Sequence, residues 1–120
     1  MADDERRDGQ GSPPKLRRPG DIRRVMRTGA AHGSERVLVY VAPGRGSSRA
    51  AVITGRRVGG AVARNRARRL LREAWRALGP GVEAGHDLVM VARGPFGRAR
   101  TPELIEEIEG LFLRAGLIER

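Results

Sequence analysis

The chain has 120 residues, no cysteine and only 3% aromatic residues, so it holds one domain with a modest core of Val, Leu, Ile and Ala and no large substrate cavity. The lack of cysteine excludes disulfides, thiolate zinc sites and a cysteine nucleophile. Lysine and arginine number 24 against 14 acidic residues, and the formal net charge of +10 is typical of proteins that bind nucleic acid.

The N-terminal segment is polar, charged and rich in Gly and Pro. This composition predicts a disordered tail over residues 1–15, followed by a single domain over residues 16–120. The tail lacks the apolar region of a signal peptide, and no apolar run approaches the roughly 20 residues that span a bilayer. We therefore expect a cytoplasmic protein.

The first predicted element is a helix that starts at Asp21, a suitable N-cap, and ends at Gly29. Two β-branched runs follow, at residues 37–41 and 50–54, on either side of a loop rich in Gly, Pro and Ser. We expect these two runs to be strands that pair antiparallel.

The segment from Ala61 to Leu78 separates arginine from aliphatic residues on two sides of one helix. At about 100° per residue, its basic and amide positions fall within an arc of about 140°. These positions are Arg64, Asn65, Arg68, Arg69, Arg72 and Arg76. Because neighbouring guanidinium groups repel one another and the planar guanidinium suits phosphate, this side is predicted to bind nucleic acid. A solvated face that binds nothing is the alternative, and a membrane-surface helix is not favoured because the apolar side is small and alanine-rich.

Residues 88–92 predict a further buried strand, and the chain ends in a helix with Thr101 as its N-cap. The order of these elements indicates an α+β sandwich with helices laid over a small sheet. His32 and His86 have no partners at metal-ligand spacing, and the glutamates of the last helix favour its dipole rather than acid–base catalysis. The residues form no recognisable catalytic constellation.

The sequence Arg64-Asn65-Arg66, followed by Ala-Arg-Arg-Leu-Leu-Arg-Glu-Ala-Trp, resembles the RNR signature of the bacterial ribonuclease P protein family. Flanking segments resemble the same family, so the likeness covers residues 16–117. It implies a two-layer α-β-β-β-α-β-α sandwich with a left-handed βαβ crossover, shared with a ribosomal protein domain. An additional short strand would then lie near residues 28–32.

The resemblance implies the accessory protein subunit of ribonuclease P, a ribonucleoprotein endonuclease that removes the 5′ leader from precursor transfer RNA. One RNA and one protein would form the holoenzyme, and the RNA would perform the hydrolysis with Mg²⁺ that the RNA itself holds. No catalytic or metal-binding residue is expected in the protein alone. A general RNA-binding or ribosome-associated protein without a catalytic partner is the alternative.

The resemblance also implies two sets of contacts. The residues implied to contact the catalytic RNA are Arg56, Arg57, Arg64, Asn65, Arg66, Arg68, Arg69 and Arg72. A cleft for the leader is implied at Ile22, Met26 and Tyr40. Family members usually carry aromatic rings at the first two cleft positions, so we expect apolar contact to replace part of the base stacking there.

Overall fold

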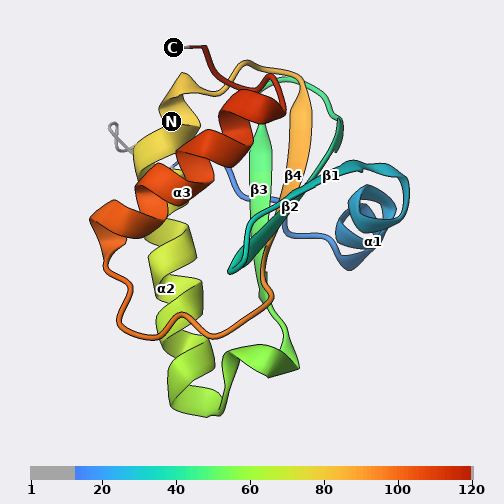
Figure 1. The fold of residues 1–120 in the computed structure, drawn as a ribbon. Helices are drawn as coiled ribbons and strands as arrows, with labels where there is room; N and C mark the ends of the chain where they lie inside the picture. Colours follow the sequence, from blue (N-terminus) through green and yellow to red (C-terminus); the bar gives the residue numbers. More distant parts are fainter. Residues whose placement is uncertain (1–12, 120) are drawn as a thin grey trace.

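The computed structural model describes residues 13–119. Within that range the elements are α1 (Pro19–Thr28), β1 (Ala30–Gly33), β2 (Val37–Pro43), β3 (Arg49–Thr54), α2 (Ala61–Leu78), β4 (His86–Ala92) and α3 (Thr101–Arg114). Short 3₁₀ turns at Arg56–Val58 and Gly79–Gly81 flank α2 (Figure 1). This order confirms the α-β-β-β-α-β-α arrangement. None of the helices in the described range has the length and apolarity that a membrane span requires.

The strands form one mixed sheet in the order β1-β2-β4-β3. β4 pairs antiparallel with β2 and parallel with β3, so Val89 lies between Tyr40 and Ala51. The prediction that residues 37–41 pair directly with residues 50–54 is wrong, because β4 lies between the two strands. β4 is buried on both faces of the sheet, and a central position removes more of its apolar surface from water than an edge position would.

β1 is the strand that the resemblance implies near residues 28–32 and that the local sequence does not indicate. Its sequence is AAHG, and most of its residues are exposed. Ala30 pairs with Val41 of β2. The chain enters β1 through Gly29, where a Cβ would lie 2.6 Å from the carbonyl oxygen of Val25 and 2.8 Å from that of Val41. Backbone pairing and a close turn therefore hold β1 in place, with little help from burial.

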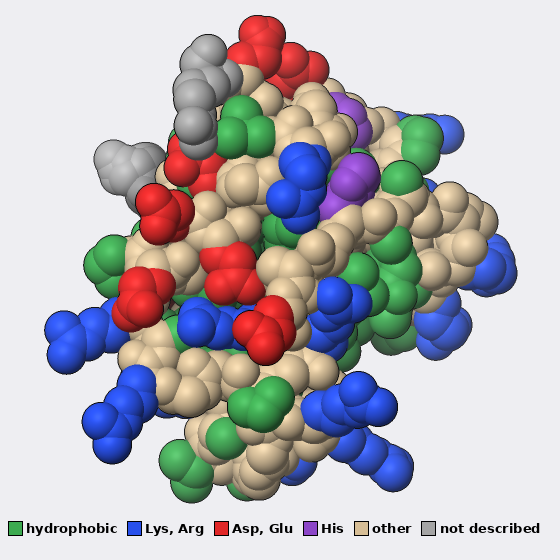
Figure 2. Space-filling view, in the orientation of Figure 1, with side chains coloured by type: hydrophobic (Ala, Val, Ile, Leu, Met, Phe, Trp, Pro, Cys, Tyr) green, Lys and Arg blue, Asp and Glu red, His purple; other side chains and the backbone are tan. Residues whose placement is uncertain are grey.

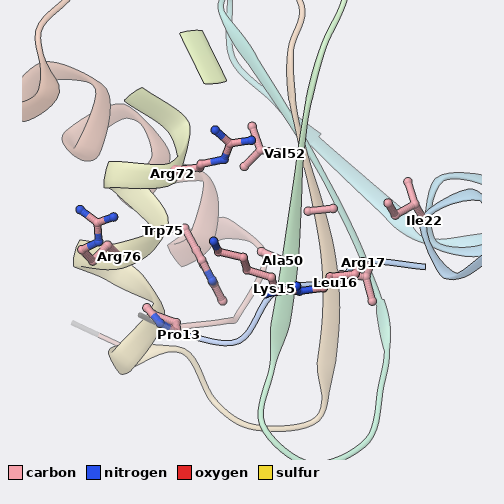
Figure 3. Close-up of a pocket in the computed structure, with 11 residues that line it drawn as sticks. Pro13, Lys15, Leu16, Arg17, Ile22, Ala50, Val52, Arg72, Trp75 and Arg76 are labelled. Carbon is pink, nitrogen blue, oxygen red and sulfur yellow. The ribbon is translucent and has the colours of Figure 1, made fainter. Parts of the chain in front are cut away.

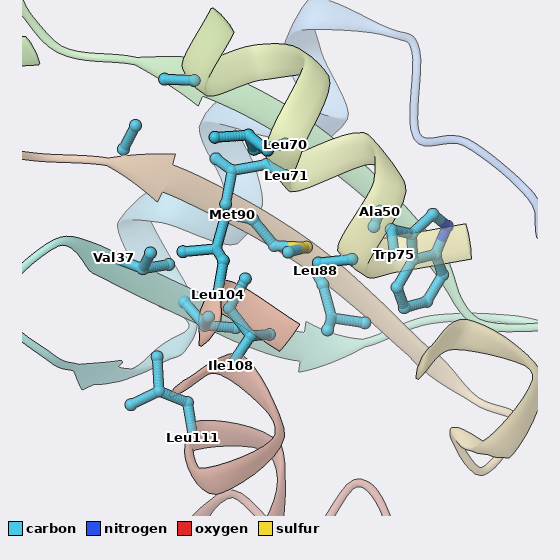
Figure 4. Close-up of a cluster of buried hydrophobic side chains, with 14 of the residues drawn as sticks. Val37, Ala50, Leu70, Leu71, Trp75, Leu88, Met90, Leu104, Ile108 and Leu111 are labelled. Atoms are coloured by element: carbon cyan, nitrogen blue, oxygen red, sulfur yellow. The ribbon is translucent and has the colours of Figure 1, made fainter. Parts of the chain in front are cut away.

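The sheet carries apolar side chains on both faces. α2 and α3 cover one face, where the larger core lies (Figures 1 and 4). Trp75 and Phe112 meet edge to face in this core, with ring centroids 6.3 Å apart. The main aliphatic members of this core are Leu70, Leu71, Leu88, Met90, Leu104, Ile108 and Leu111. A smaller cluster around Val25 and Val89 fills the space between the other face and α1.

Both predicted helix N-caps are wrong. α1 begins one turn earlier than predicted, behind Arg18, and Asp21 lies in its first turn, where a carboxylate favours the helix dipole. α3 begins at Thr101 behind Arg100. The Thr101 hydroxyl donates a hydrogen bond to Oε1 of Glu73 at 2.7 Å, so it joins α3 to α2.

The described residues include a short segment ahead of the predicted boundary between tail and domain. The carbonyl oxygen of Pro14 accepts a hydrogen bond from Nε1 of Trp75 at 3.1 Å. Lys15 forms a parallel bridge with Ala50 of β3, and Leu16 is buried. Pro14 and Lys15, which the sequence assigns to the tail, therefore lie beside β3 and pair with Ala50. The remainder of the predicted tail lies outside the described residues.

Asp87 joins three elements at the start of β4. Its carboxylate is buried and accepts hydrogen bonds from Nε and Nη2 of Arg49 on β3, at 3.0 and 2.8 Å. Arg24 of α1 donates from Nη2 at 2.6 Å. Burial by itself raises the pKa of Asp87, but the hydrogen bonds and charges of Arg49 and Arg24 outweigh it and hold that pKa below its ordinary value. The hydrogen bond to Asp87 raises the pKa of Arg49.

Replacing Asp87 by Asn is expected to lower the free energy of unfolding at neutral pH by about 1–3 kcal/mol, because the amide leaves two arginines without their anion. Since folding lowers the pKa of Asp87, its contribution is complete above the unfolded value of about 3.9 and is lost as the pH falls through the lowered value. Urea denaturation at neutral and at acid pH measures both effects. The difference between wild type and variant should shrink in acid.

Asp21→Asn is the matched control for this prediction. Its carboxylate lies 3.7 Å from Arg24 at the surface, and its loss should cost less than about 1 kcal/mol. A difference between wild type and Asp87→Asn that does not change with pH would show that the charge of Asp87 contributes nothing to stability.

Candidate nucleic-acid interface

α2 turns its apolar side to the sheet and its basic side to solvent, as the sequence predicts. The buried positions are Ala67, Leu70, Leu71, Ala74 and Trp75. Asn65, Arg69, Arg72 and Arg76 are exposed, and Arg64 and Arg68 are half-buried. On the face shown in Figure 2, basic side chains project around the lower half of the molecule, where α2 lies, and acidic side chains run along α3. We call this exposed side of α2 the arginine face.

The linker before α2 adds two further arginines to this surface. Arg56 and Arg57 lie exposed on the 3₁₀ turn that follows β3. Gly59 ends the turn with φ of +131°, and a Cβ there would lie 3.0 Å from the Cβ of Ala63. Only glycine adopts this conformation readily, so Gly59 sets the path of the linker into the helix. Its carbonyl oxygen accepts a hydrogen bond from Nη1 of Arg64 at 3.0 Å.

Arg68 is oriented by two neighbouring side chains. Its Nη1 donates to Oγ1 of Thr54 at 3.0 Å, and its Nη2 donates to Oδ1 of Asn65. A guanidinium carries five N–H donors, so these bonds fix its direction and leave other donors for a ligand. The sequence reasoning missed Thr54, because a threonine that ends a strand carries no local signal of this contact.

Arg66 lies off the arginine face. Its Nη1 donates to the carbonyl oxygen of Gly97 at 3.1 Å, and its Nη2 donates to that of Ala99. The guanidinium therefore holds the loop between β4 and α3 against α2. The RNA contact that the resemblance implies for Arg66 stays a prediction.

The centre of the arginine face has few charges that oppose it. Arg69 has a side chain that is 65% exposed, and its Nε lies 3.8 Å from Oε2 of Glu73, a spacing at which a surface pair contributes little. Arg72 and Arg76 form no hydrogen bond or ion pair with other residues in the described range. Guanidinium groups that gather with so little neutralisation favour an anionic ligand.

The implied leader residues lie on the opposite side of the sheet. Ile22 of α1 and Tyr40 of β2 are half-buried, and both pack against the cluster around Val25 and Val89. Met26 follows Ile22 by one turn of α1 and is 37% exposed. The three side chains form a partly exposed apolar surface between α1 and β2, in which Tyr40 provides the aromatic ring.

The described residues do not form a metal centre. Among residues 13–119, no group of three or more His, Cys, Asp or Glu side chains is placed to hold a metal ion. Nδ1 of His86 lies 3.1 Å from the carbonyl oxygen of Glu83, and both carboxylate oxygens of Asp87 are occupied by arginines. What these surfaces offer a ligand is positive charge, hydrogen-bond donors and apolar area.

Known proteins share this sequence and this fold. The family model described as Ribonuclease P matches residues 12–116. A ribonuclease P protein component from Roseiflexus castenholzii is 38% identical over 107 residues, which cover 88% of either chain. One from Chloroflexus aggregans is 50% identical over 82 residues, which span 68% of this chain and 61% of that relative. The solved RNase P protein from Thermotoga maritima is similar with a TM-score of 0.74 and 26% identity, covering 88% of this chain and 98% of the other.

The sandwich and its arginine face define a small basic RNA-binding protein of the α+β class. The chain belongs to the bacterial ribonuclease P protein family. Members of this family are accessory subunits of a ribonucleoprotein endonuclease that processes the 5′ end of transfer RNA, and they work with an RNA partner. The resemblance carried by the RNR sequence is thereby confirmed, and the general RNA-binding alternative is not favoured.

The contacts of Arg66 and Arg69 predict that removing the first lowers stability and removing the second weakens RNA binding. Arg66→Ala should lower the free energy of unfolding by about 1–3 kcal/mol, because two loop carbonyls lose a charged donor. Arg69→Ala should change it by less than about 0.5 kcal/mol and should weaken RNA binding instead. Urea denaturation and RNA filter binding, applied to both variants, measure the two effects. Equal stability of the two variants would contradict a structural role for Arg66.

Proposed function

We propose that this chain binds the catalytic RNA of ribonuclease P through the arginine face of α2 together with Arg56 and Arg57. The observation that carries the proposal is the set of exposed guanidinium groups on one side of α2. The carboxylate of Glu73 lies beside them, 3.8 Å from Arg69, and offsets little of their charge. Arg64 and Arg68 are already oriented by bonds within the protein, so less side-chain entropy is lost when they meet phosphate. The arginines supply positive charge, and the RNA performs the cleavage.

We also propose that the 5′ leader of precursor transfer RNA lies on the apolar surface between α1 and β2. Tyr40 offers a ring on which one base can stack, a contact worth about 1–3 kcal/mol. Ile22 and Met26 offer aliphatic area in place of rings. The proposal therefore assigns most of the leader affinity on this surface to Tyr40.

The proposed holoenzyme contains one RNA and one protein and works in the cytoplasm. The hydrolysis uses Mg²⁺ held by the RNA. The protein's part is to place arginines among phosphates that repel one another, and this lowers the concentration of Mg²⁺ needed to fold the RNA around its substrate. The formal net charge of +10 supports this part of the proposal.

The affinity for the catalytic RNA should depend steeply on salt. If the arginine face and its linker contact about six phosphates, the binding constant should fall roughly 10³-fold between about 50 and 200 mM monovalent salt, because each contact releases a condensed counterion. Filter binding over this range measures the slope. A binding constant that does not change with salt would contradict phosphate contacts as the basis of recognition.

The proposed function is tested by cleavage of a precursor transfer RNA with a bacterial ribonuclease P RNA at low Mg²⁺. The wild-type protein should restore cleavage at the correct site. Arg64→Ala should reduce the restored rate roughly tenfold, because it removes an oriented phosphate donor worth about 1.4 kcal/mol.

Arg45→Ala is the matched control, because it removes one exposed arginine from the loop between β2 and β3, on the α1 side of the sheet. It should leave the cleavage rate close to that of the wild type. Cleavage that does not respond to the wild-type protein would overturn the proposed function. Equal losses in the two variants would show that total charge matters and the arginine face does not.

A further inference from the structure

A hollow opens beside the edge strand β3, between α2 and the N-terminal segment (Figure 3). Its volume is about 210 Å³. Sites for whole drug-sized ligands begin at about 300 Å³, so this hollow has room for one planar group rather than for a complete cofactor. Arg72, Arg76 and Ile22 border it from the two surfaces proposed to bind RNA, and the space between them has no assigned ligand.

The rim of the hollow is cationic. Arg72 and Arg76 reach it from α2, and Lys15 and Arg17 reach it from the N-terminal segment. Within residues 13–119, none of these four side chains has a hydrogen bond or an ion pair, and none of the residues that line the hollow is acidic. Four cations without a partner among residues 13–119, gathered around one small space, are complementary to an anion.

The floor of the hollow is apolar. An edge of the Trp75 ring, which is 4% exposed, forms one wall, and half-buried Val52 of β3 and buried Leu16 contribute aliphatic surface. In Figure 3 the Arg72 side chain reaches toward Val52, and Lys15 extends beside the indole. The Trp75 Nε1–H is bonded to the carbonyl oxygen of Pro14, so the ring is held in place. A fixed aromatic edge below a cationic rim matches a nucleotide, which joins a flat base with an aromatic face to a phosphate.

The hollow also touches both surfaces that the proposed function assigns to RNA. Arg72 belongs to the arginine face, and Ile22 belongs to the surface between α1 and β2. These two surfaces lie on opposite sides of the sheet, and β3 is the edge between them. A single strand of RNA that leaves one surface for the other at this edge passes over the hollow.

We propose that the hollow binds one nucleotide of single-stranded RNA, with its base against Trp75 and Val52 and the adjoining phosphates at Lys15, Arg17 and Arg76. The inference rests on the proposed function, because it assigns the RNA of that function a path around the β3 edge. It adds a binding site formed by the N-terminal segment and α2 together.

The test uses Trp75 as the probe, because it is the only tryptophan of the chain. A short single-stranded oligouridylate is titrated into the full-length protein at low salt. The fluorescence of Trp75 should change and saturate as the oligomer binds. An oligomer of equal length without bases should bind more weakly and should leave the fluorescence unchanged. An equal fluorescence change with the abasic oligomer would overturn the placement of a base in the hollow.

The double variant Lys15→Ala/Arg17→Ala tests the rim. The slope of log binding constant against log salt should become less steep by about 1.4, because two phosphate contacts to a single strand are lost. Arg45→Ala/Arg98→Ala removes the same charge from exposed loops and should leave the slope unchanged. Arg76→Ala, on α2, should reduce the slope by about half as much as the double variant. Unchanged slopes in both rim variants would overturn the proposal.

Failure of this inference can be told apart from failure of the proposed function. If the rim variants bind the oligomer as the wild type does, while the wild-type protein still restores cleavage at low Mg²⁺, the hollow is not an RNA site and the proposed function stands. If the wild-type protein fails to restore cleavage but the rim variants lose oligomer binding, the hollow is an RNA site in a protein that acts differently. Far-ultraviolet circular dichroism checks that each variant is folded.

Discussion

The insertion of β4 between β2 and β3 is the constraint on which the RNA-facing surface depends. Because β4 runs parallel to β3, the chain needs a crossover between them, and α2 is that crossover. Leu70 and Leu71 of α2 must be buried against the sheet, so the opposite side of the helix has to face solvent. The arginines occupy that side. The position of β4 therefore determines which way the positive charge of α2 points.

The arginines of this chain serve two different physical roles. Arg24 and Arg49 neutralise the buried carboxylate of Asp87, and Arg66 satisfies carbonyl groups of a loop. Removing such a group leaves buried or fixed acceptors without a donor, which costs stability. Arg72 and its neighbours on the arginine face direct donors to solvent instead. Composition counts both kinds alike, so the number of arginines is larger than the number available to a ligand.

The β3 edge shows how one sheet edge can be both protected and used. An uncovered edge strand offers backbone groups to which another chain can pair, and charged side chains are a common protection. Here the backbone of Pro14 and Leu16 pairs with Ala50, and cations surround the neighbouring hollow. Positive charge that discourages pairing with another strand also attracts phosphate. In the proposed site, the cations that protect the edge are the same ones that bind phosphate.

The sequence by itself determined the arginine face and the family, because helical periodicity and the run from Arg64 to Trp75 are local properties of the chain. It paired residues 37–41 with 50–54 wrongly, since a short loop suggests a hairpin and the burial of a strand that comes much later is not a local signal. Tertiary structure alone decided the charge network of Asp87 and the hollow beside Trp75. The hydrogen bond from Trp75 to Pro14 joins residues that are 61 positions apart. Contacts of that separation depend on how the elements pack, and no local pattern records them.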